Sequence, residues 1–282
     1  MREYSLGLYE KSMPHSLSLA EKLTCTREND FDFLEVSIDE SDEKLSRLYW
    51  GEVQRREVSE AICETGVAIG SMCLSVHRKY PLGSTQAATR QKSLDIMARA
   101  LDLACCWGIR VIQLAGYDVY YEESSKETGT FFAENLSKSV DMAAKAGVVL
   151  AFETMETPFM DTMAKAMAYI KAIGSPWLQV YPDLGNLTNA AILYDHAISE
   201  DIASGWGHIA AMHLKETIPG HYRDIPFGTG HVDFARGIAT ASSLGVRRFV
   251  GEFWDSAKLD YRVQIEHACR FLRKEADGCI WG

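Results

Sequence analysis

The sequence lacks the marks of several protein classes. None of its 282 positions falls in a run of about 18 apolar residues, the length that a membrane-spanning helix needs. The first residues also lack the apolar stretch of a secretory signal, so we expect a cytoplasmic protein with no membrane among its partners. No linker rich in proline, glycine or serine interrupts the chain, which predicts a single domain over residues 1–282.

The sequence also lacks a C-x-x-C motif and any cluster of positive charge. The seven cysteines are an odd number without a C-x-x-C motif, so we expect buried free thiols. The 29 Lys and Arg residues against 39 Asp and Glu residues give a formal net charge of −10, with no basic run as an exception. This balance repels a phosphate backbone and predicts no nucleic-acid partner. A small anionic substrate is still compatible, because a few placed cations and backbone amides can hold one phosphate.

Short apolar segments alternate with longer stretches of helical periodicity. Hydrophobic residues make up 47% of the chain, enough to form a substantial core. Glycine-terminated helices are predicted at residues 91–108, 131–147 and 161–174. The predicted strands are residues 5–9, 31–38, 67–75, 110–116, 148–153, 178–183, 209–215 and 249–254. Because strands that alternate with helices form parallel sheets, and eight repeats close a barrel, we predict an α/β protein with one (β/α)₈ barrel.

Polar residues stand where the last four predicted strands end. Glu153, Asp183, His213 and Glu252 each follow an apolar segment, and in such a barrel the chemistry lies at the carboxyl ends of the strands. Three carboxylates in a partly dry pocket raise one another's pKa unless a cation is present. Oxygen-rich ligation with one imidazole suits Mn²⁺, Mg²⁺, Co²⁺ or Zn²⁺, so these four residues predict one divalent metal site.

At these residues, and across nearly the whole chain, the sequence resembles the xylose-isomerase-like barrel superfamily, specifically its L-ribulose-5-phosphate 3-epimerases. The segments SMCLSVHRKYPLGS (residues 71–84) and GIRVIQLAGYDVYY (residues 108–121) carry much of the resemblance, together with YPDLGNL, PFGTGHVDF and GEFW. The resemblance implies a metal-dependent isomerase that interconverts L-xylulose 5-phosphate and L-ribulose 5-phosphate. It also implies that the four strand-end residues coordinate one cation, which holds the sugar's carbonyl and adjacent hydroxyl oxygens.

By the same resemblance, Glu153 and Glu252 are the two catalytic bases. Inversion at carbon 3 needs a proton removed from one face of a planar enediolate and returned to the other. Two carboxylates on opposite sides of the intermediate would serve both steps. A cation that polarises the ketone would stabilise the enediolate.

Residues that bind the rest of the substrate are less sharply defined. His77 could bond a substrate hydroxyl or pack in its loop, and Asn186 could orient a ligand or form a turn. Lys215 is the first candidate for phosphate binding, with Arg223, His221 and the amides of a G-x-G motif in the following loop, at Gly228 and Gly230. Second candidates are Arg78 and Lys79, and the aromatic group Tyr117, Tyr120 and Tyr121 could wall the sugar pocket or cover the rim.

Other functions on the same barrel stay open at this point. An epimerase of unphosphorylated ketoses would share the metal site, and a dehydratase of cyclic polyols would also remove a proton beside a carbonyl. An abasic-site endonuclease is disfavoured because it needs more metal ligands and a basic surface. A sugar-phosphate sensor would gain nothing from two opposed carboxylates. The expected partner is a small sugar phosphate, and the sequence allows either a monomer or a homodimer.

Overall fold

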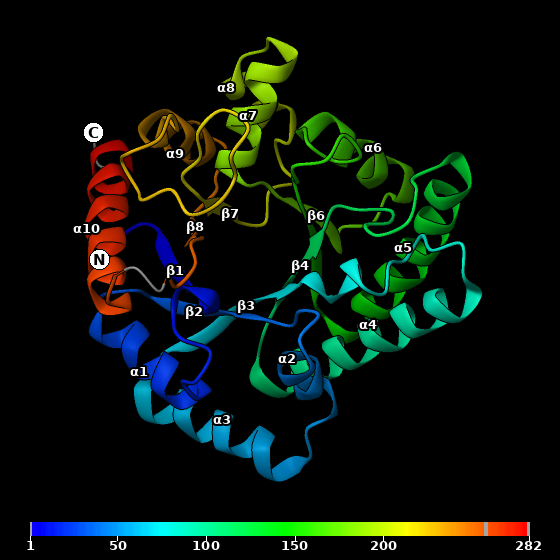
Figure 1. Cartoon of the computed structure of the whole chain (residues 1–282), viewed down its shortest axis with the longest axis horizontal. Coiled ribbons are helices and arrows are strands. Elements are labelled where there is room, and N and C mark those ends of the chain that lie inside the picture. Colours follow the sequence, from blue (N-terminus) through cyan, green and yellow to red (C-terminus); the bar gives the residue numbers. More distant parts are fainter. Residues whose placement is uncertain (1, 257–258, 281–282) are drawn as a thin grey trace.

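A computed structural model describes residues 2–256 and 259–280. Eight parallel strands form its centre, and helices surround them (Figure 1). Neighbouring strands pair in the order β6, β5, β4, β3, β2, β1, β8, β7. Parallel bridges from Val180 to Ile209 and from Asp183 to His213 join the two ends of that series. The predicted (β/α)₈ barrel is therefore confirmed.

The strands lie close to their predicted positions. They are β1 (Ser5–Tyr9), β2 (Phe33–Ser37), β3 (Ala68–Leu74), β4 (Val111–Ala115), β5 (Val149–Glu153), β6 (Leu178–Tyr181), β7 (Met212–Leu214) and β8 (Arg248–Gly251). The largest difference is at β7, which is three residues long where the sequence predicts seven. Residues 209 and 210 contact β6 only through isolated backbone bonds, because this is the seam where the barrel closes.

The helices form the outer layer. They are α1 (Leu19–Glu28), α2 (Asp42–Ser46), α3 (Glu52–Thr65), α4 (Ala87–Trp107), α5 (Lys126–Ala146), α6 (Met163–Ile173), α7 (Leu184–Tyr194), α8 (Ile198–Ser204), α9 (Phe234–Ser243) and α10 (Tyr261–Ile280). The glycines expected to end three helices do so: Gly108, Gly147 and Gly174 have φ values of 74°, 67° and 65°. A side chain is strained in this left-handed conformation, whereas glycine adopts it freely. In the described residues, no helix is both long and apolar enough to cross a membrane.

The barrel interior changes from apolar to polar along its axis. The Phe33 ring fills the space between β1 and β3, where a Cβ on either Gly7 or Gly70 would lie 2.3 Å from its carbons. Since strand side chains alternate between the two faces, the inward residues that follow toward the carboxyl ends include Glu35, Gln113 and Glu153. All three are buried. The fold thus places buried polar groups under the barrel mouth.

The cysteine prediction is only partly right. Cys25, Cys73 and Cys269 are buried free thiols, and no disulfide joins the described cysteines. Cys63 of α3, and Cys105 and Cys106 of α4, are instead exposed. They occupy outward positions on the helices, which composition alone does not reveal.

Candidate active site

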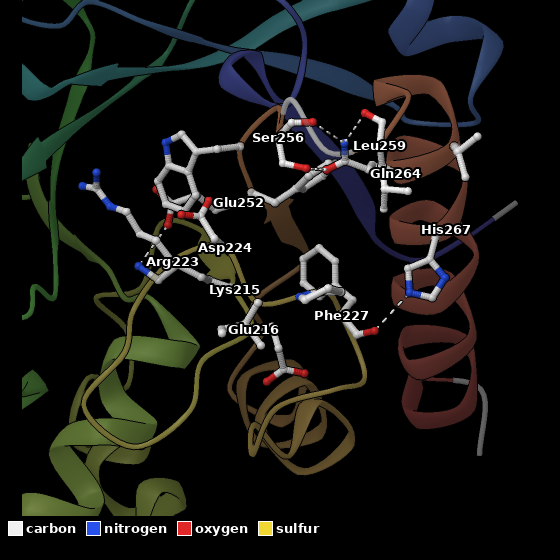
Figure 2. A pocket seen from close by; sticks show the side chains of 15 residues that line it. Lys215, Glu216, Arg223, Asp224, Phe227, Glu252, Ser256, Leu259, Gln264 and His267 are labelled. Carbon is white, nitrogen blue, oxygen red and sulfur yellow. Dashed lines mark hydrogen bonds and ion pairs between the residues drawn. The ribbon is translucent and has the colours of Figure 1, made fainter.

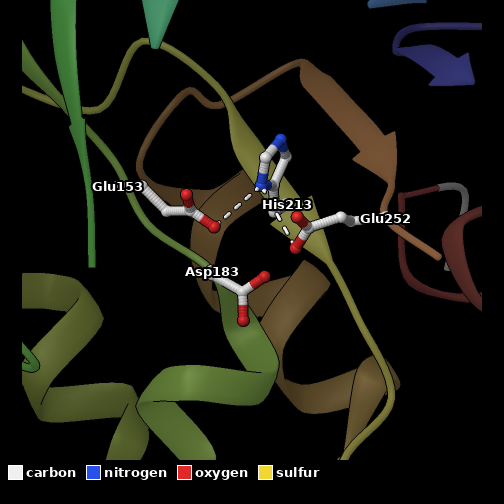
Figure 3. Close-up of side chains that lie close together, drawn as sticks. All are labelled: Glu153, Asp183, His213 and Glu252. Carbon is white, nitrogen blue, oxygen red and sulfur yellow. Dashed lines mark hydrogen bonds and ion pairs between the residues drawn. The ribbon is translucent and has the colours of Figure 1, made fainter. Parts of the chain in front are cut away.

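The four predicted metal ligands converge at the carboxyl ends of β5 to β8. Each of Glu153, Asp183, His213 and Glu252 offers one ligand atom, and these atoms all lie within 4.8 Å of one another (Figure 3). His213 Nδ1 is 3.3 Å from Glu153 Oε1 and 3.5 Å from Glu252 Oε2. All four side chains are buried. The sequence therefore identified a group that the barrel does bring together.

The local backbone explains why Asp183 points into this cluster. Asp183 caps the N-terminus of α7, because its Oδ1 accepts a 2.6 Å hydrogen bond from the backbone amide of Asn186. The Asn186 side chain donates to the carbonyl of Thr154, whose hydroxyl accepts a bond from the Asp183 amide. These bonds tie β6 and α7 to the end of β5. Asn186 thus orients Asp183, as one of its two predicted roles requires.

The cluster contains oxygen atoms that the protein leaves without hydrogen bonds. Asp183 Oδ2 and Glu252 Oε2 are both buried, and neither accepts a hydrogen bond of good geometry within the described part of the chain, although both lie 3.2 Å from one cation, Lys215 Nζ. One lysine for three buried carboxylates leaves negative charge that costs free energy unless a further cation neutralises it. Three carboxylates and an imidazole nitrogen are also the donors that a divalent cation takes up. The four residues could therefore hold one metal ion.

Lys215 lies inside the same cluster. Its Nζ is 3.2 Å from Asp183 Oδ2 and 3.2 Å from Glu252 Oε2, and the side chain is buried. Its charge balances part of the negative charge of the carboxylates. The role of Lys215 as the first phosphate anchor stays a prediction, and in this structure its ammonium group pairs with two of the predicted metal ligands.

Burial and neighbouring charges shift the pKa values in opposite directions. Burial, with the charges of Glu252 and Glu153, raises the pKa of Asp183 to about 8 against the opposing charge of Lys215. Burial acts in the same direction on Glu252, but Lys215 and His213 outweigh it and lower its pKa to about 2. Burial alone would lower the pKa of His213, but the charges of Glu35 and Glu252 outweigh it and raise this pKa well above its ordinary value. Burial and like charges thus disfavour the ionised form of Asp183, which a bound metal ion would favour.

Two further residues contact the predicted ligands. Glu35 Oε1 lies 2.7 Å from His213 Nε2, and the side-chain amide of Gln113 donates to Glu153 Oε2. Neither was assigned a role from the sequence, although both follow apolar strand segments. They could have been found from the alternation of side chains along β2 and β4, which directs both residues into the barrel.

A cavity opens between this cluster and solvent. Its volume is about 40 Å³, and its lining includes Glu153, Lys215 and Glu252 from the cluster, with Arg78 and Arg223. A larger pocket of about 270 Å³ shares Lys215, Arg223 and Glu252 with it and extends between the β7–α9 loop and α10 (Figure 2). Both predicted catalytic carboxylates therefore line the small cavity, and Glu252 also lines the larger pocket.

Arg78 and Arg223 reach the cavity from opposite sides of the barrel. Arg78 follows β3 and Arg223 follows β7, which are four strands apart in the sheet. Arg223 lies over the Trp254 ring at 4.9 Å, and Arg78 lies 5.7 Å from the Tyr117 ring centroid. The Arg78 Nε is buried and has no hydrogen-bond partner in the described residues. Tyr117 thus supports Arg78 at the rim.

Three predicted substrate-binding residues lie elsewhere or are already engaged. His77 is buried toward α4, with its Nε2 3.3 Å from the Ser93 carbonyl, and is not part of the cavity lining. The Gly228 amide donates to Glu216 at 3.0 Å, so the anion that it faces belongs to the protein. A Cβ on Gly230 would lie 2.2 Å from the Thr217 carbonyl oxygen, which shows a packing reason for glycine there. Their roles in substrate binding stay predictions, and these contacts within the protein do not support them.

Comparison with known proteins agrees with this geometry. A family model described as a xylose isomerase-like TIM barrel matches residues 24–275. An L-ribulose-5-phosphate 3-epimerase UlaE of Salmonella heidelberg (strain SL476) is 46% identical over 268 residues, or 95% of this chain and 93% of that protein. The protein of the same name from Shigella flexneri is 42% identical over 273 residues, which cover 96% and 95% of the two chains.

The same fold occurs in solved structures. The structure of an L-ribulose 3-epimerase superposes with a TM-score of 0.78 at 18% identity and covers 98% of this chain and 95% of that one. The expected resemblance to an epimerase of the isomerase class is confirmed by the more similar relatives. The chain therefore belongs to the xylose isomerase-like TIM barrel family, and within it to the same family as these L-ribulose-5-phosphate 3-epimerases.

Proposed function

We propose that this protein is a metal-dependent 3-epimerase that interconverts L-xylulose 5-phosphate and L-ribulose 5-phosphate. The observation that carries the proposal is the buried group of Glu153, Asp183, His213 and Glu252 at the mouth of the barrel. The substrate comes from the names of relatives that are 42% and 46% identical to this chain. A bound Mn²⁺, Zn²⁺, Mg²⁺ or Co²⁺ ion would polarise the ketone and lower the free energy needed to remove the proton at C3.

Glu153 and Glu252 are suited to the two proton transfers. They come from β5 and from the end of β8, and Figure 3 shows their carboxylates facing the cluster from two sides. One carboxylate removes the C3 proton, and the other returns a proton to the opposite face of the planar intermediate. Gln113 donates to Glu153, and Lys215 lies beside Glu252, so each base has its own fixed neighbour. Asp183 and His213 complete the ligand set.

The phosphate group binds at Arg78, with Arg223 opposite. Arg78 lines the cavity, and its buried Nε has a hydrogen-bonding capacity that no described residue uses. A guanidinium group held in this way is suited to bind phosphate oxygens. The first candidate from the sequence, Lys215, pairs with two carboxylates instead. The phosphate is therefore assigned to the rim and the reacting carbons to the cluster.

Proton NMR in deuterated water tests the reaction. L-xylulose 5-phosphate is incubated with the protein and each of the four metal ions in turn. We expect deuterium at C3 and the appearance of L-ribulose 5-phosphate, with no loss of water from the sugar. Dehydration would show a lyase, and faster turnover of unphosphorylated L-xylulose would show an epimerase of free ketoses. Either result would contradict the proposal.

The variant Arg78→Gln tests the phosphate site. We expect KM for the phosphorylated ketose to rise by ~10-fold or more, because one charged hydrogen bond contributes about 1.5–3 kcal/mol. Any turnover of the free ketose should not change, since it has no phosphate to lose. Lys79→Gln is the matched control, because Lys79 is the neighbouring cation but lies over Tyr80 and outside the cavity lining. Equal effects of both variants would exclude a specific role for Arg78.

A further inference from the structure

The His213 ring is held from both of its nitrogen atoms. Its Nδ1 faces the carboxylates of Glu153 and Glu252 at 3.3 Å and 3.5 Å. Its Nε2 lies 2.7 Å from Glu35 Oε1, on the side away from those carboxylates. Glu35 comes from β2 and His213 from β7, so this contact crosses the barrel interior. Both side chains are completely buried.

Glu35 is itself fixed by two hydroxyl groups. Ser71 Oγ donates to Glu35 Oε2 at 2.6 Å, and Tyr181 Oη donates to the same oxygen at 2.8 Å. Ser71 is the residue paired with Glu35 in the sheet, and the Tyr181 ring packs on His213 with centroids 4.8 Å apart. Glu35 Oε1 is therefore left with His213 as its partner. A buried carboxylate with three donors is positioned far more precisely than a solvated one.

The chemistry of these groups determines which nitrogen can bind a metal. A carboxylate oxygen accepts hydrogen bonds, and the contact of Nε2 with Glu35 at 2.7 Å is much shorter than that of Nδ1 with Glu153 at 3.3 Å, so Nε2 is the nitrogen that keeps its proton when the ring is neutral. The lone pair of a neutral imidazole is then on Nδ1, the nitrogen that faces Glu153 and Glu252. We propose that Glu35 is a positioning residue of the metal centre, which holds His213 with Nδ1 directed to the cation and increases its strength as a ligand. Carboxylates commonly orient metal-bound histidines in this way.

This inference rests on the proposed function, since it concerns the same metal ion, but it assigns a role to a residue outside the ligand set. Ser71 and Tyr181 contribute to this role through Glu35, because their hydrogen bonds to Oε2 leave Oε1 free for His213. Glu35 also adds a fourth carboxylate to the three of the cluster. This further negative charge favours the binding of a divalent cation over that of an uncharged molecule such as water.

Metal affinity of the whole chain tests the role directly. Mn²⁺ and Zn²⁺ are titrated into the metal-free protein by calorimetry, without substrate. We expect Glu35→Gln to raise the dissociation constant by ~10–100-fold, because the amide keeps the shape but not the charge. Tyr181→Phe should raise it by less, since Glu35 then keeps Ser71. In the Zn²⁺-loaded wild type, long-range ¹H–¹⁵N NMR should place the His213 ring proton on Nε2.

Asp118→Asn is the matched control. Asp118 is also a buried carboxylate that accepts bonds from two hydroxyls, those of Ser124 and Thr128, but it contacts no histidine. We expect its metal affinity to equal that of the wild type. If Glu35→Gln does not fold, Tyr181→Phe and the NMR result decide. Wild-type affinity in Tyr181→Phe, or a His213 proton on Nδ1, would overturn the inference, whereas a wild type that binds neither ion would overturn the proposed function itself.

Discussion

Two buried clusters of charged side chains lie at the mouth of this barrel, and they have opposite charge balance. At the end of β1, Glu10 is surrounded by three cations: Lys22 at 2.9 Å, Lys44 at 2.7 Å and Arg47 at 2.8 Å. Both oxygens of Glu10 accept hydrogen bonds, including one from the backbone amide of Ser37. This cluster needs no further partner to satisfy its carboxylate.

The cluster between β5 and β8 has three carboxylates, one imidazole and only one lysine. Two of its buried oxygens, Asp183 Oδ2 and Glu252 Oε2, accept no hydrogen bond from the described residues. The cations around Glu10 lower its pKa far below the ordinary value in spite of burial, whereas burial and like charges raise the pKa of Asp183 to about 8. A carboxylate with an excess of protein cations serves to join elements of the fold, whereas an excess of carboxylates leaves a place for a cationic ligand.

The largest expected effect is the loss of catalysis when one base is removed. Glu153→Gln or Glu252→Gln should lower the rate of C3 proton exchange by about 10²–10⁴-fold, because each variant lacks one proton-transfer group. Stability should change little in Glu153→Gln, whereas Glu252→Gln should also lower the free energy of unfolding, because Lys215 and His213 attract the Glu252 carboxylate. Deuterium exchange by NMR measures the first effect and thermal unfolding the second. Full exchange in either variant would contradict the two-base scheme.

For the cluster around Glu10, we expect a loss of stability. Glu10→Gln should lower the free energy of unfolding by about 3–5 kcal/mol, because it leaves three cations buried without their anion. Urea unfolding at neutral pH, with the metal removed, provides the measurement. The exposed Glu21→Gln variant is a control for carboxylate removal on α1. A loss below about 1 kcal/mol would remove the distinction between the two clusters.

His77 extends the comparison to a buried group without a charge partner. Burial lowers the pKa of His77 to about 4, below the value of about 6.5 in an unfolded chain. As the pH falls, the unfolded chain therefore binds this proton first. The stability contributed by neutral His77 is complete above about pH 6.5 and is lost as the pH falls toward 4.

We expect the variant His77→Gln to reduce the loss of stability over this pH range by about 3 kcal/mol, from a pKa difference of about 2.5. Urea unfolding at pH 7 and at pH 4 gives the two free energies. His15→Gln is the control, because His15 is exposed. Identical acid sensitivity in wild type and His77→Gln would show that His77 is not buried as a neutral group.

The smallest expected change concerns Asp183. In metal-free protein, Asp183→Asn should alter the free energy of unfolding by less than about 1 kcal/mol or raise it, because burial and the charges of Glu252 and Glu153 disfavour the carboxylate that the amide replaces. Added Mn²⁺ should raise the melting temperature of the wild type and not that of this variant. A metal-induced rise of equal size in both would exclude Asp183 as a ligand.

Strand alternation and strand ends carried most of the successful predictions. Each strand was placed from a short apolar segment, and the four residues that could hold a metal ion were selected because they follow the last four of these segments. The substrate contacts were predicted less well. Lys215 and Gly228 are near the mouth, as expected, but the first pairs with Asp183 and the second with Glu216. Glu35 lies within β2, and nothing in its neighbours along the chain connects it with His213.

The sequence by itself determined the barrel, the inward side of each strand and the residues that end the strands at its mouth. These properties depend on periodicity and on the order of elements, which are local in the chain. Only the tertiary structure decided which charges pair: that Glu10 has three cations, that Glu35 holds His213, and that Arg78 retains an unused donor at the cavity. These contacts join residues 12 to 178 positions apart, and their geometry depends on strand register and side-chain packing, which a local pattern does not contain.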